Sequence, residues 1–462
     1  MTQVLDNQKM SSHSYLSRLA QEATDASAAS PDWLDRLRKS AIARFEKVGF
    51  PSRRAEAWRF TDVQPISRTA FEPAAEVPQK QAAELVQKFS FRASGAIELV
   101  LVNGRLHPEL SQIGRLPRGV RVMSLREAIT SESAVVEKYL AHLAAIEKNP
   151  FVALNTGFIS DGAFILLPTG VTIEQPIHIL ALSVSGEAPG VSHPRVLVVA
   201  EDRVTATVLE TYAGDVSDTG VYFTNAVTEI ICGAECNIDH CRLQQESLAA
   251  YHVSTFQVQL GRATNFVSHA CTTGARLARN DLNCVMNGEG AYATLNGLVL
   301  IDGQQHCDNH TLLHHEKANC PSHELYKHVL DGKASAVFKG QIFVQKDAQK
   351  TDSKQTNKTL LLSDDAVMNS QPALEIYADD VKCTHGSTTG PVDEDMVFYL
   401  RTRGIGLESA RHLLTYAFAA DVTRRIKVEP VRIRIEDHMA AKFGLPLDLR
   451  ITDVTNHDKV AN

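Results

Sequence analysis

The chain lacks the segments and motifs by which several protein classes are recognised. No apolar run approaches the roughly 18 residues that a membrane-spanning helix needs. The phosphate-binding pattern G-x-x-x-x-G-K-S/T is absent, and so are the G-x-S-x-G of serine hydrolases and the H-E-x-x-H of zinc proteases. These absences argue against a transmembrane protein and against an ATPase or hydrolase of those types.

The chain also has no excess of basic residues and no dense set of cysteines. The formal net charge of -7 and the pI of about 6.2 give no electrostatic reason to expect nucleic acid or an anionic membrane as a partner. Eight cysteines in a chain of this length do not form a disulfide scaffold. Residues 1–32 carry acidic groups and no apolar stretch typical of a signal peptide, so we expect reduced thiols and a cytoplasmic location.

Helical periodicity marks the N-terminal region, residues 1–95. The spacing of apolar residues predicts helices over 31–49 and over Gln79–Phe89. The apolar run at 96–102 then predicts a strand. One more helix, over 132–148, is expected as an insertion in the domain that follows.

The middle domain, residues 96–385, has the character of an all-β unit from residue 155 onward. Short apolar runs such as AFILLP and RVLVVA recur there at intervals of roughly ten residues, separated by small polar turns. No long helix intervenes, which excludes a βαβ sheet. A sandwich, a propeller and a β-helix remain possible. The uneven strand lengths argue against a propeller, and the scarcity of two-residue hairpin turns favours a parallel solenoid.

A polar tract at residues 347–357, DAQKTDSKQTN, lies late in this domain. Lysines recur every four residues around it, at Lys346, Lys350, Lys354 and Lys358. We interpret the tract as solvated surface, and its lack of glycine argues against a phosphate-binding loop.

Helical periodicity returns in the C-terminal region, residues 386–462. It predicts a short helix at 391–403, an amphipathic helix at 407–426 and a third helix at 430–443. Three short helices bury too little apolar surface to form an independent core. They therefore need a partner surface, either on the β unit or on another chain.

The stretch 374–390, LEIYADDVKCTHGSTTG, predicts a half-buried strand because apolar and polar residues alternate. If that alternation continues, Val381, Cys383 and His385 share the face directed away from the core. A thiol and an imidazole on one exposed face are donors that soft metals prefer. The pair is equally compatible with a small structural cysteine and a turn histidine, because C-x-H falls short of a complete ligand set.

Two other segments concentrate cysteine and histidine. Cys232, Cys236 and Cys241 form a C-x3-C-x4-C run, but Cys236 and Cys241 would face opposite sides of a regular strand, which favours buried structural cysteines over a metal site. The segment from His306 to His323 is denser, yet its spacing does not match a zinc finger. We expect it to form strands and turns of the β unit, with a zinc site as the alternative.

The residues around the C-x-H pair resemble a known signature. KCTHGSTTG followed by FYLRTRGI, within residues 360–405, resembles the C-terminal signature of the SufB/SufD family of the SUF iron–sulfur cluster assembly machinery. The sequences of both segments are similar to those of the SufD branch of that family. The resemblance continues upstream through residues 341–362 and recurs as PSRRAEAWRFTDV at 51–63.

This resemblance implies a mainly β fold, a right-handed parallel β-helix flanked by N-terminal and C-terminal α-helical regions. It implies a non-catalytic scaffold subunit that pairs with a SufB-like subunit and holds a SufC-like ABC ATPase on its C-terminal helices. A transient iron–sulfur cluster shared with the SufB-like subunit, and no permanently bound cofactor, is then expected. His385 is the implied assembly residue at that interface, with Cys383 beside it.

The resemblance also suggests where partners bind. The C-terminal helices, above all residues 403–425, are the expected contact with the ATPase. The candidate partner-binding residues are Val381, Arg403, Ala410, Leu414 and Phe418.

Other interpretations stay open. A SufB-like subunit that carries the cluster itself is one alternative, although the HG after KCT and the lack of any cysteine before Cys232 argue against it. A carbohydrate-active or acyl-transfer enzyme on a β-helix is another, and it rests on fold analogy alone. Unpaired strand edges at a solenoid end also predict a homodimer of the isolated chain.

Overall fold

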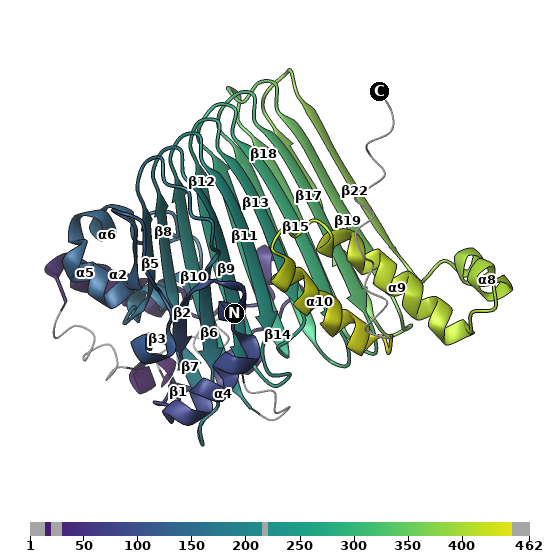
Figure 1. Cartoon of the computed structure of the whole chain (residues 1–462), viewed down its shortest axis with the longest axis horizontal. Coiled ribbons are helices and arrows are strands. Elements are labelled where there is room, and N and C mark those ends of the chain that lie inside the picture. The colour runs from purple at the N-terminus through teal and green to yellow at the C-terminus, as the bar shows by residue number, and fades with distance from the viewer. Residues whose placement is uncertain (1–13, 20–29, 215–219, 446–462) are drawn as a thin grey trace.

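The computed structural model describes residues 14–19, 30–214 and 220–445. Two large, mainly parallel sheets dominate the molecule, and helices flank them at both ends (Figure 1). In these ranges no helix is long and apolar enough to cross a lipid bilayer.

The strands belong to two sheets, which we call sheet A and sheet B. Sheet A contains β1 (Glu72–Pro73), β4 (Arg121–Ser124), β5 (Gly162–Leu167), β7 (Gly190–Ser192), β8 (Arg195–Ala200), β10 (Tyr222–Cys232), β12 (Tyr251–Leu260), β14 (Leu277–Met286), β16 (His306–His315), β18 (Ser335–Val344), β20 (Val367–Ser370) and β21 (Ala373–Ile376). Sheet B contains β2 (Ile97–Val102), β3 (Arg105–Leu106), β6 (Ile177–Ser183), β9 (Thr205–Gly214), β11 (Asn237–Gln245), β13 (Asn265–Thr272), β15 (Tyr292–Ile301), β17 (Pro321–Leu330), β19 (Asp352–Leu361) and β22 (Lys382–Gly390).

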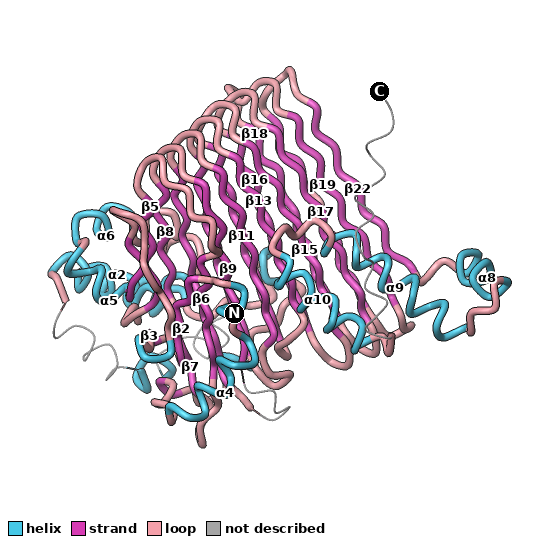
Figure 2. Tube along the Cα trace, viewed as in Figure 1, coloured by secondary structure: helices cyan, strands magenta, loops and turns pink. Residues whose placement is uncertain are grey.

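The pairing order shows that the chain winds as a solenoid. β12 pairs in parallel with β14, while the intervening β13 pairs with β11 and β15 of the other sheet. Each coil therefore adds one strand to each sheet, and the coils stack side by side (Figure 2). This arrangement confirms the predicted parallel β-helix with helical flanks.

The coils differ in length, which explains why no clean repeat is visible in the sequence. Tyr251 is paired with Leu277, 26 residues later, whereas Pro321 is paired with Asp352, 31 residues later. The strands stay in register because the difference in length lies in the corner segments between them.

Alternate side chains of each strand point into the solenoid, where stacking arranges them in columns. Apolar members include Phe256 beside Leu282. Buried polar members have dedicated partners: the Glu210 carboxylate accepts hydrogen bonds from Tyr212 and Thr228 at 2.7 and 2.8 Å, and from His240 at 3.0 Å. Burial alone would raise the pKa of Glu210, but these donors hold it below its usual value.

Helices cover the outer faces of both sheets. α2, α5 and α6 pack on sheet A near its N-terminal end, and α4 packs on β6 of sheet B. α9 and α10 lie along the outer face of sheet B, whereas α8 projects from the body (Figure 1). The helices are α2 (Asp32–Val48), α3 (Gln64–Arg68), α4 (Gln79–Phe89), α5 (Leu125–Ser131), α6 (Ser133–Tyr139), α7 (Pro150–Gly157), α8 (Glu394–Thr402), α9 (Leu407–Thr423) and α10 (Glu429–Lys442). The predicted helices are therefore present, except that the one expected over 132–148 is shorter and ends with α6.

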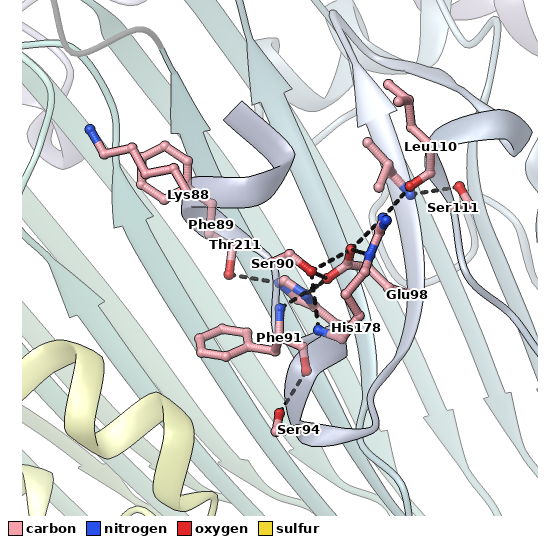
Figure 3. Close-up of polar contacts among 12 residues, drawn as sticks. Lys88, Phe89, Ser90, Phe91, Ser94, Glu98, Leu110, Ser111, His178 and Thr211 are labelled. Atoms are coloured by element: carbon pink, nitrogen blue, oxygen red, sulfur yellow. Dashed lines mark hydrogen bonds and ion pairs between the residues drawn. The ribbon is translucent and has the colours of Figure 1, made fainter. Parts of the chain in front are cut away.

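A buried carboxylate fastens the N-terminal region to sheet B. Glu98 of β2 accepts hydrogen bonds from the Ser90 hydroxyl, the backbone N–H of Phe91 and the ring of His178 (Figure 3). Burial would raise the pKa of Glu98, but these hydrogen bonds hold it at about 2. Arg434 of α10 donates to the carbonyl oxygen of Ser90, so both helical regions meet here.

A second buried carboxylate explains why the predicted insertion helix ends early. Glu229 of β10 forms an ion pair with Arg195 and accepts hydrogen bonds from the backbone N–H groups of Ala141, Leu143 and Ala144. Those N–H groups cannot also bond within a helix, and Ala141 has a left-handed φ of 62°. The segment after α6 is therefore held on sheet A as a turn.

Glu229→Gln should lower the free energy of unfolding by about 3 kcal/mol, because it leaves the buried Arg195 guanidinium without a charged partner. Glu235→Gln removes a surface ion pair with Arg262 and should cost under about 1 kcal/mol. Urea unfolding followed by circular dichroism measures both variants. Equal stability of Glu229→Gln and wild type would show that the pair does not hold this segment.

Candidate functional site

The C-terminal end of the solenoid is left open. Among the described strands, β22 pairs only with β19, and β20 and β21 pair only with β18. Both sheets therefore end in a strand whose outer edge has no ladder partner in this part of the chain. We call the surface formed by β20, β21 and β22 the open end, of which Figure 1 labels β22.

The stretch 374–390 does not form the single strand that its alternation predicts. β21 lies in sheet A and β22 in sheet B, with a corner of the solenoid between them. Side-chain alternation is not carried through a corner, because the backbone leaves the extended conformation there. The predicted outward orientation of Val381, Cys383 and His385 is therefore wrong.

Strand register places Cys383 and His385 on the inward row of β22. Their ladder partners on β19 are Ser353 and Gln355, both of which are buried inside the solenoid. Val381 and Cys383 pack against the interior apolar cluster. Cys383 and His385 thus share a face, as the spacing predicts, but that face looks into the solenoid.

No further coil of the described chain covers this inward row, so it is reached through the open end. His385 is exposed and Cys383 is half-buried. Burial raises the pKa of the Cys383 thiol, and the nearby Asp352 carboxylate adds to the rise. Such a thiol becomes a thiolate ligand when a metal ion displaces its proton. One sulfur and one imidazole are too few donors for a complete metal site.

Buried polar side chains form a layer directly beneath the open end. Gln355 Nε2 donates to Glu324 Oε2 at 2.6 Å. Asn357 Nδ2 donates to Ser370 Oγ at 2.9 Å, and the Ser387 hydroxyl lies 2.8 Å from that of Ser370. Polar groups therefore continue from the solenoid interior to the row that holds His385.

The tract at residues 347–357 supplies part of this layer, although its composition predicts solvated surface. Lys354 and Lys358 are exposed as expected, whereas Gln355 and Asn357 are buried. The charged residues Asp352, Lys354 and Lys358 all have the same parity, and the uncharged polar residue directly after each of them has the other, which is the signal of a strand with a polar inward face.

A second exposed surface lies on α8. Its exposed apolar side chains are those of Met396, Phe398 and Tyr399, and Phe398 is 67% exposed. Leu407, at the start of α9, is also an exposed apolar side chain. Val397 faces the opposite way and is buried against α9. We call these four exposed residues the α8 surface, which the sequence-based candidates did not include.

The candidate partner-binding residues of the C-terminal helices occupy different environments. Arg403 is exposed beside the α8 surface, with its guanidinium 5.2 Å from the ring centre of Tyr399. Ala410 is fully buried between α8 and α9, so it supports α8 and is not itself exposed to a partner. Leu414 packs against the same cluster, and Phe418 is half-buried against β17.

Two protein-family models match the chain. One, described as the SufBD core domain of the SUF system for FeS cluster assembly, matches residues 182–418. The other, the SufBD N-terminal region, matches residues 9–179. The chain belongs to the SufBD family. The family resemblance seen around KCTHGSTTG is thereby confirmed.

Relatives of this SufBD chain match it over most of its length. An iron–sulfur cluster assembly SufBD family protein of Synechocystis is 30% identical over 411 residues, covering 88% of this chain and 90% of the relative. The iron–sulfur cluster assembly protein SufD of Escherichia coli is 29% identical, covering 84% of this chain and 88% of its own. The SufD of Bacillus subtilis is 26% identical, covering 87% of this chain and 92% of its own.

The other cysteine and histidine clusters of this SufBD chain are dispersed over several faces of its coils. Cys236 packs in the interior and Cys241 lies beneath α9 and α10, as their spacing predicts. Within the segment from His306 to His323, His315 is fully buried, whereas His310 lies on the outer face of sheet A. Nowhere in the described ranges do three or more histidine, cysteine or acidic side chains gather as a metal site requires.

Glu324 makes the layer beneath the open end sensitive to pH. Burial raises the pKa of Glu324 to about 7, although the hydrogen bond from Gln355 and the neighbouring Thr311 hydroxyl oppose the rise. The folded chain therefore holds this proton more tightly than the unfolded chain, in which a glutamate has a pKa of about 4.3. Its contribution to stability falls as the pH rises from about 4.3 to about 7, and stays low above that range.

Glu324→Gln removes this titration. The free energy of unfolding of the variant minus that of wild type should therefore increase when the pH is raised from 5 to 8. This increase is expected to be up to about 3 kcal/mol. Urea unfolding of both proteins at pH 5 and at pH 8 measures it. Glu235→Gln, at an exposed carboxylate, serves as the control and should follow the wild-type pH dependence. A Glu324→Gln variant with that same dependence would contradict the assignment.

Proposed function

We propose that this SufBD chain is a non-catalytic scaffold subunit of the SufD type, on which an iron–sulfur cluster is built at the contact with a second scaffold subunit. The observation that carries the proposal is the open end, where His385 and Cys383 stand on one accessible inward row. The SufD names of the Escherichia coli and Bacillus subtilis relatives support the assignment to this branch.

The open end suits pairing with a SufB-like subunit. Unpaired backbone N–H and C=O groups along β21 and β22 can extend the ladder of another solenoid. The partner then supplies the donors that Cys383 and His385 lack, because iron in such clusters accepts both thiolate and imidazole ligands. The cluster is the cargo of this site and is bound transiently. The same edges allow the isolated chain to form a homodimer.

The α8 surface is the proposed docking site of a SufC-like ATPase. A set of exposed apolar side chains on and beside a projecting helix is the kind of surface that a partner buries. Residues 391–393 alone connect β22 to α8, so a displacement of α8 by the ATPase acts directly on the open end. All eight cysteines are free thiols, which suits a reducing compartment, and we propose that the complex works in the cytoplasm.

His385→Ala should lower the iron and sulfide content of the complex at least about fivefold, because loss of one ligand weakens the shared site. The complex with SufB-like and SufC-like subunits, co-expressed and reconstituted anaerobically, is measured by visible absorbance and iron analysis. Co-purification of the three subunits should be unchanged.

His323→Ala is the matched control, because His323 is an exposed histidine on the outer face of β17. Normal loading of the His385→Ala complex would exclude His385 as an assembly residue. Loading of the isolated wild-type chain, without a second scaffold subunit, would favour the alternative of a SufB-like cluster carrier.

Phe398→Ala combined with Tyr399→Ala should weaken ATPase binding at least about tenfold, because buried aromatic anchors contribute most of the energy of such contacts. The dissociation constant is measured by calorimetry with the purified SufC-like subunit. Leu248→Ala, which removes an exposed apolar side chain outside the α8 surface, is the control. Unchanged affinity of the double variant would exclude α8 as the docking site.

A further inference from the structure

A buried glutamine lies directly beneath His385. Gln355 of β19 is the ladder partner of His385, and Glu324 of β17 is the ladder partner of Gln355. The three side chains therefore belong to one inward column, one coil apart, which ends at the open end. Gln355 is only 1% exposed and Glu324 only 3% exposed, so both depend on protein groups for their hydrogen bonds.

The hydrogen bonding of the Gln355 amide is half complete. Its Nε2 donates to Glu324 Oε2 at 2.6 Å. Its Oε1 is buried and has no hydrogen-bond partner in the described part of the chain. An unsatisfied buried acceptor lowers the stability of a protein by on the order of 1–3 kcal/mol. We therefore expect an N–H or O–H group to donate a hydrogen bond to this oxygen.

The opposite wall of the solenoid holds the Gln355 amide in this place. Gly340 of β18 faces it across the interior, and a Cβ atom at Gly340 would lie 2.1 Å from Gln355 Nε2. The amide therefore occupies space that exists only because residue 340 has no side chain. At pH 8 Glu324 is mainly ionised and only accepts, so Nε2 is the end of the amide that faces it. Oε1 is then the end left for another group.

His385 is the next side chain of the column toward the open end, and its position suits it to complete this bond. It holds the next position of the column and carries a ring N–H, whereas the thiol of Cys383 beside it is a weak donor. Ser387, on its other side, is already hydrogen-bonded to Ser370.

We propose that Gln355 Oε1 accepts a hydrogen bond from one ring nitrogen of His385, which leaves the other nitrogen directed out of the open end. Gln355 is then a positioning residue, and Glu324 acts through it by fixing the orientation of the amide. This inference rests on the function proposed for His385 above. Histidine ligands usually donate their second ring N–H to an oxygen acceptor, and loss of that acceptor lowers metal affinity about 10-fold to 100-fold.

The contact is tested first in the isolated full-length chain. Ring-15N-labelled histidine is incorporated, and the signals of His385 are identified by their loss in His385→Ala. At pH 8 we expect one neutral tautomer of His385 to dominate in wild type and a mixture in Gln355→Leu. Thr359→Val, an isosteric change at another buried inward position of β19, should leave the tautomer unchanged. Equal tautomer populations in wild type and Gln355→Leu would overturn the inference.

The consequence for assembly is tested in the co-expressed complex. Gln355→Leu and Glu324→Gln should each lower cluster loading, by no more than His385→Ala does, while the subunits still co-purify. Urea unfolding of Glu324→Gln at pH 8 is measured in parallel, so that a loss of loading in a variant at least as stable as wild type does not reflect unfolding. Thr359→Val should load normally.

The two proposals fail in different ways. If His385→Ala abolishes loading but Gln355→Leu loads normally with an unchanged tautomer, the positioning role is overturned and the proposed function stands. If His385→Ala loads normally, the proposed function falls, and with it the role of Gln355 in assembly. The tautomer comparison then still decides whether the contact itself exists.

Discussion

Backbone hydrogen bonding between successive coils is the constraint on which the rest of this structure depends. Every inner strand satisfies its N–H and C=O groups only because a coil lies on each side of it. Helices such as α9 and α10 are packed onto the outer faces of these stacked coils, and the interior columns exist because the coils stay in register. The last strand of each sheet has a coil on one side only. Its outer edge therefore stays unpaired unless another chain supplies a partner strand.

Buried carboxylates show how the solenoid tolerates charge. Glu98, Glu210 and Glu229 each accept hydrogen bonds from at least three donors, among them a histidine or an arginine. Glu324 is different, because its neighbours are a threonine and an amide, and its pKa is raised instead of lowered. The least compensated of these carboxylates thus lies in the column that leads to His385.

A short chain segment connects the open end to α8, although the open end is a strand edge and the α8 surface is an apolar helix face. Within residues 391–393, Val392 is buried in the cluster that joins α8 to α9. A partner that shifts α8 therefore pulls on β22 through a short, anchored connection. The proposed assembly of a cluster at one surface and docking of an ATPase at the other are physically compatible for this reason.

The sequence by itself determined the fold class, the helical flanks and the pairing of Cys383 with His385 on one face. The helical flanks, the mainly β middle and the shared face follow from local periodicity, whereas the choice of a parallel β-helix came from the resemblance of the long signature around KCTHGSTTG to the SufB/SufD family. The direction of that face was decided only by the tertiary structure, because the corner between β21 and β22 resets the alternation. The burial of Ala410 and the placement of Gln355 beneath His385 were also beyond local pattern. Both depend on which distant strand or helix lies alongside, and that contact is set by the stacking of coils about thirty residues apart in the chain.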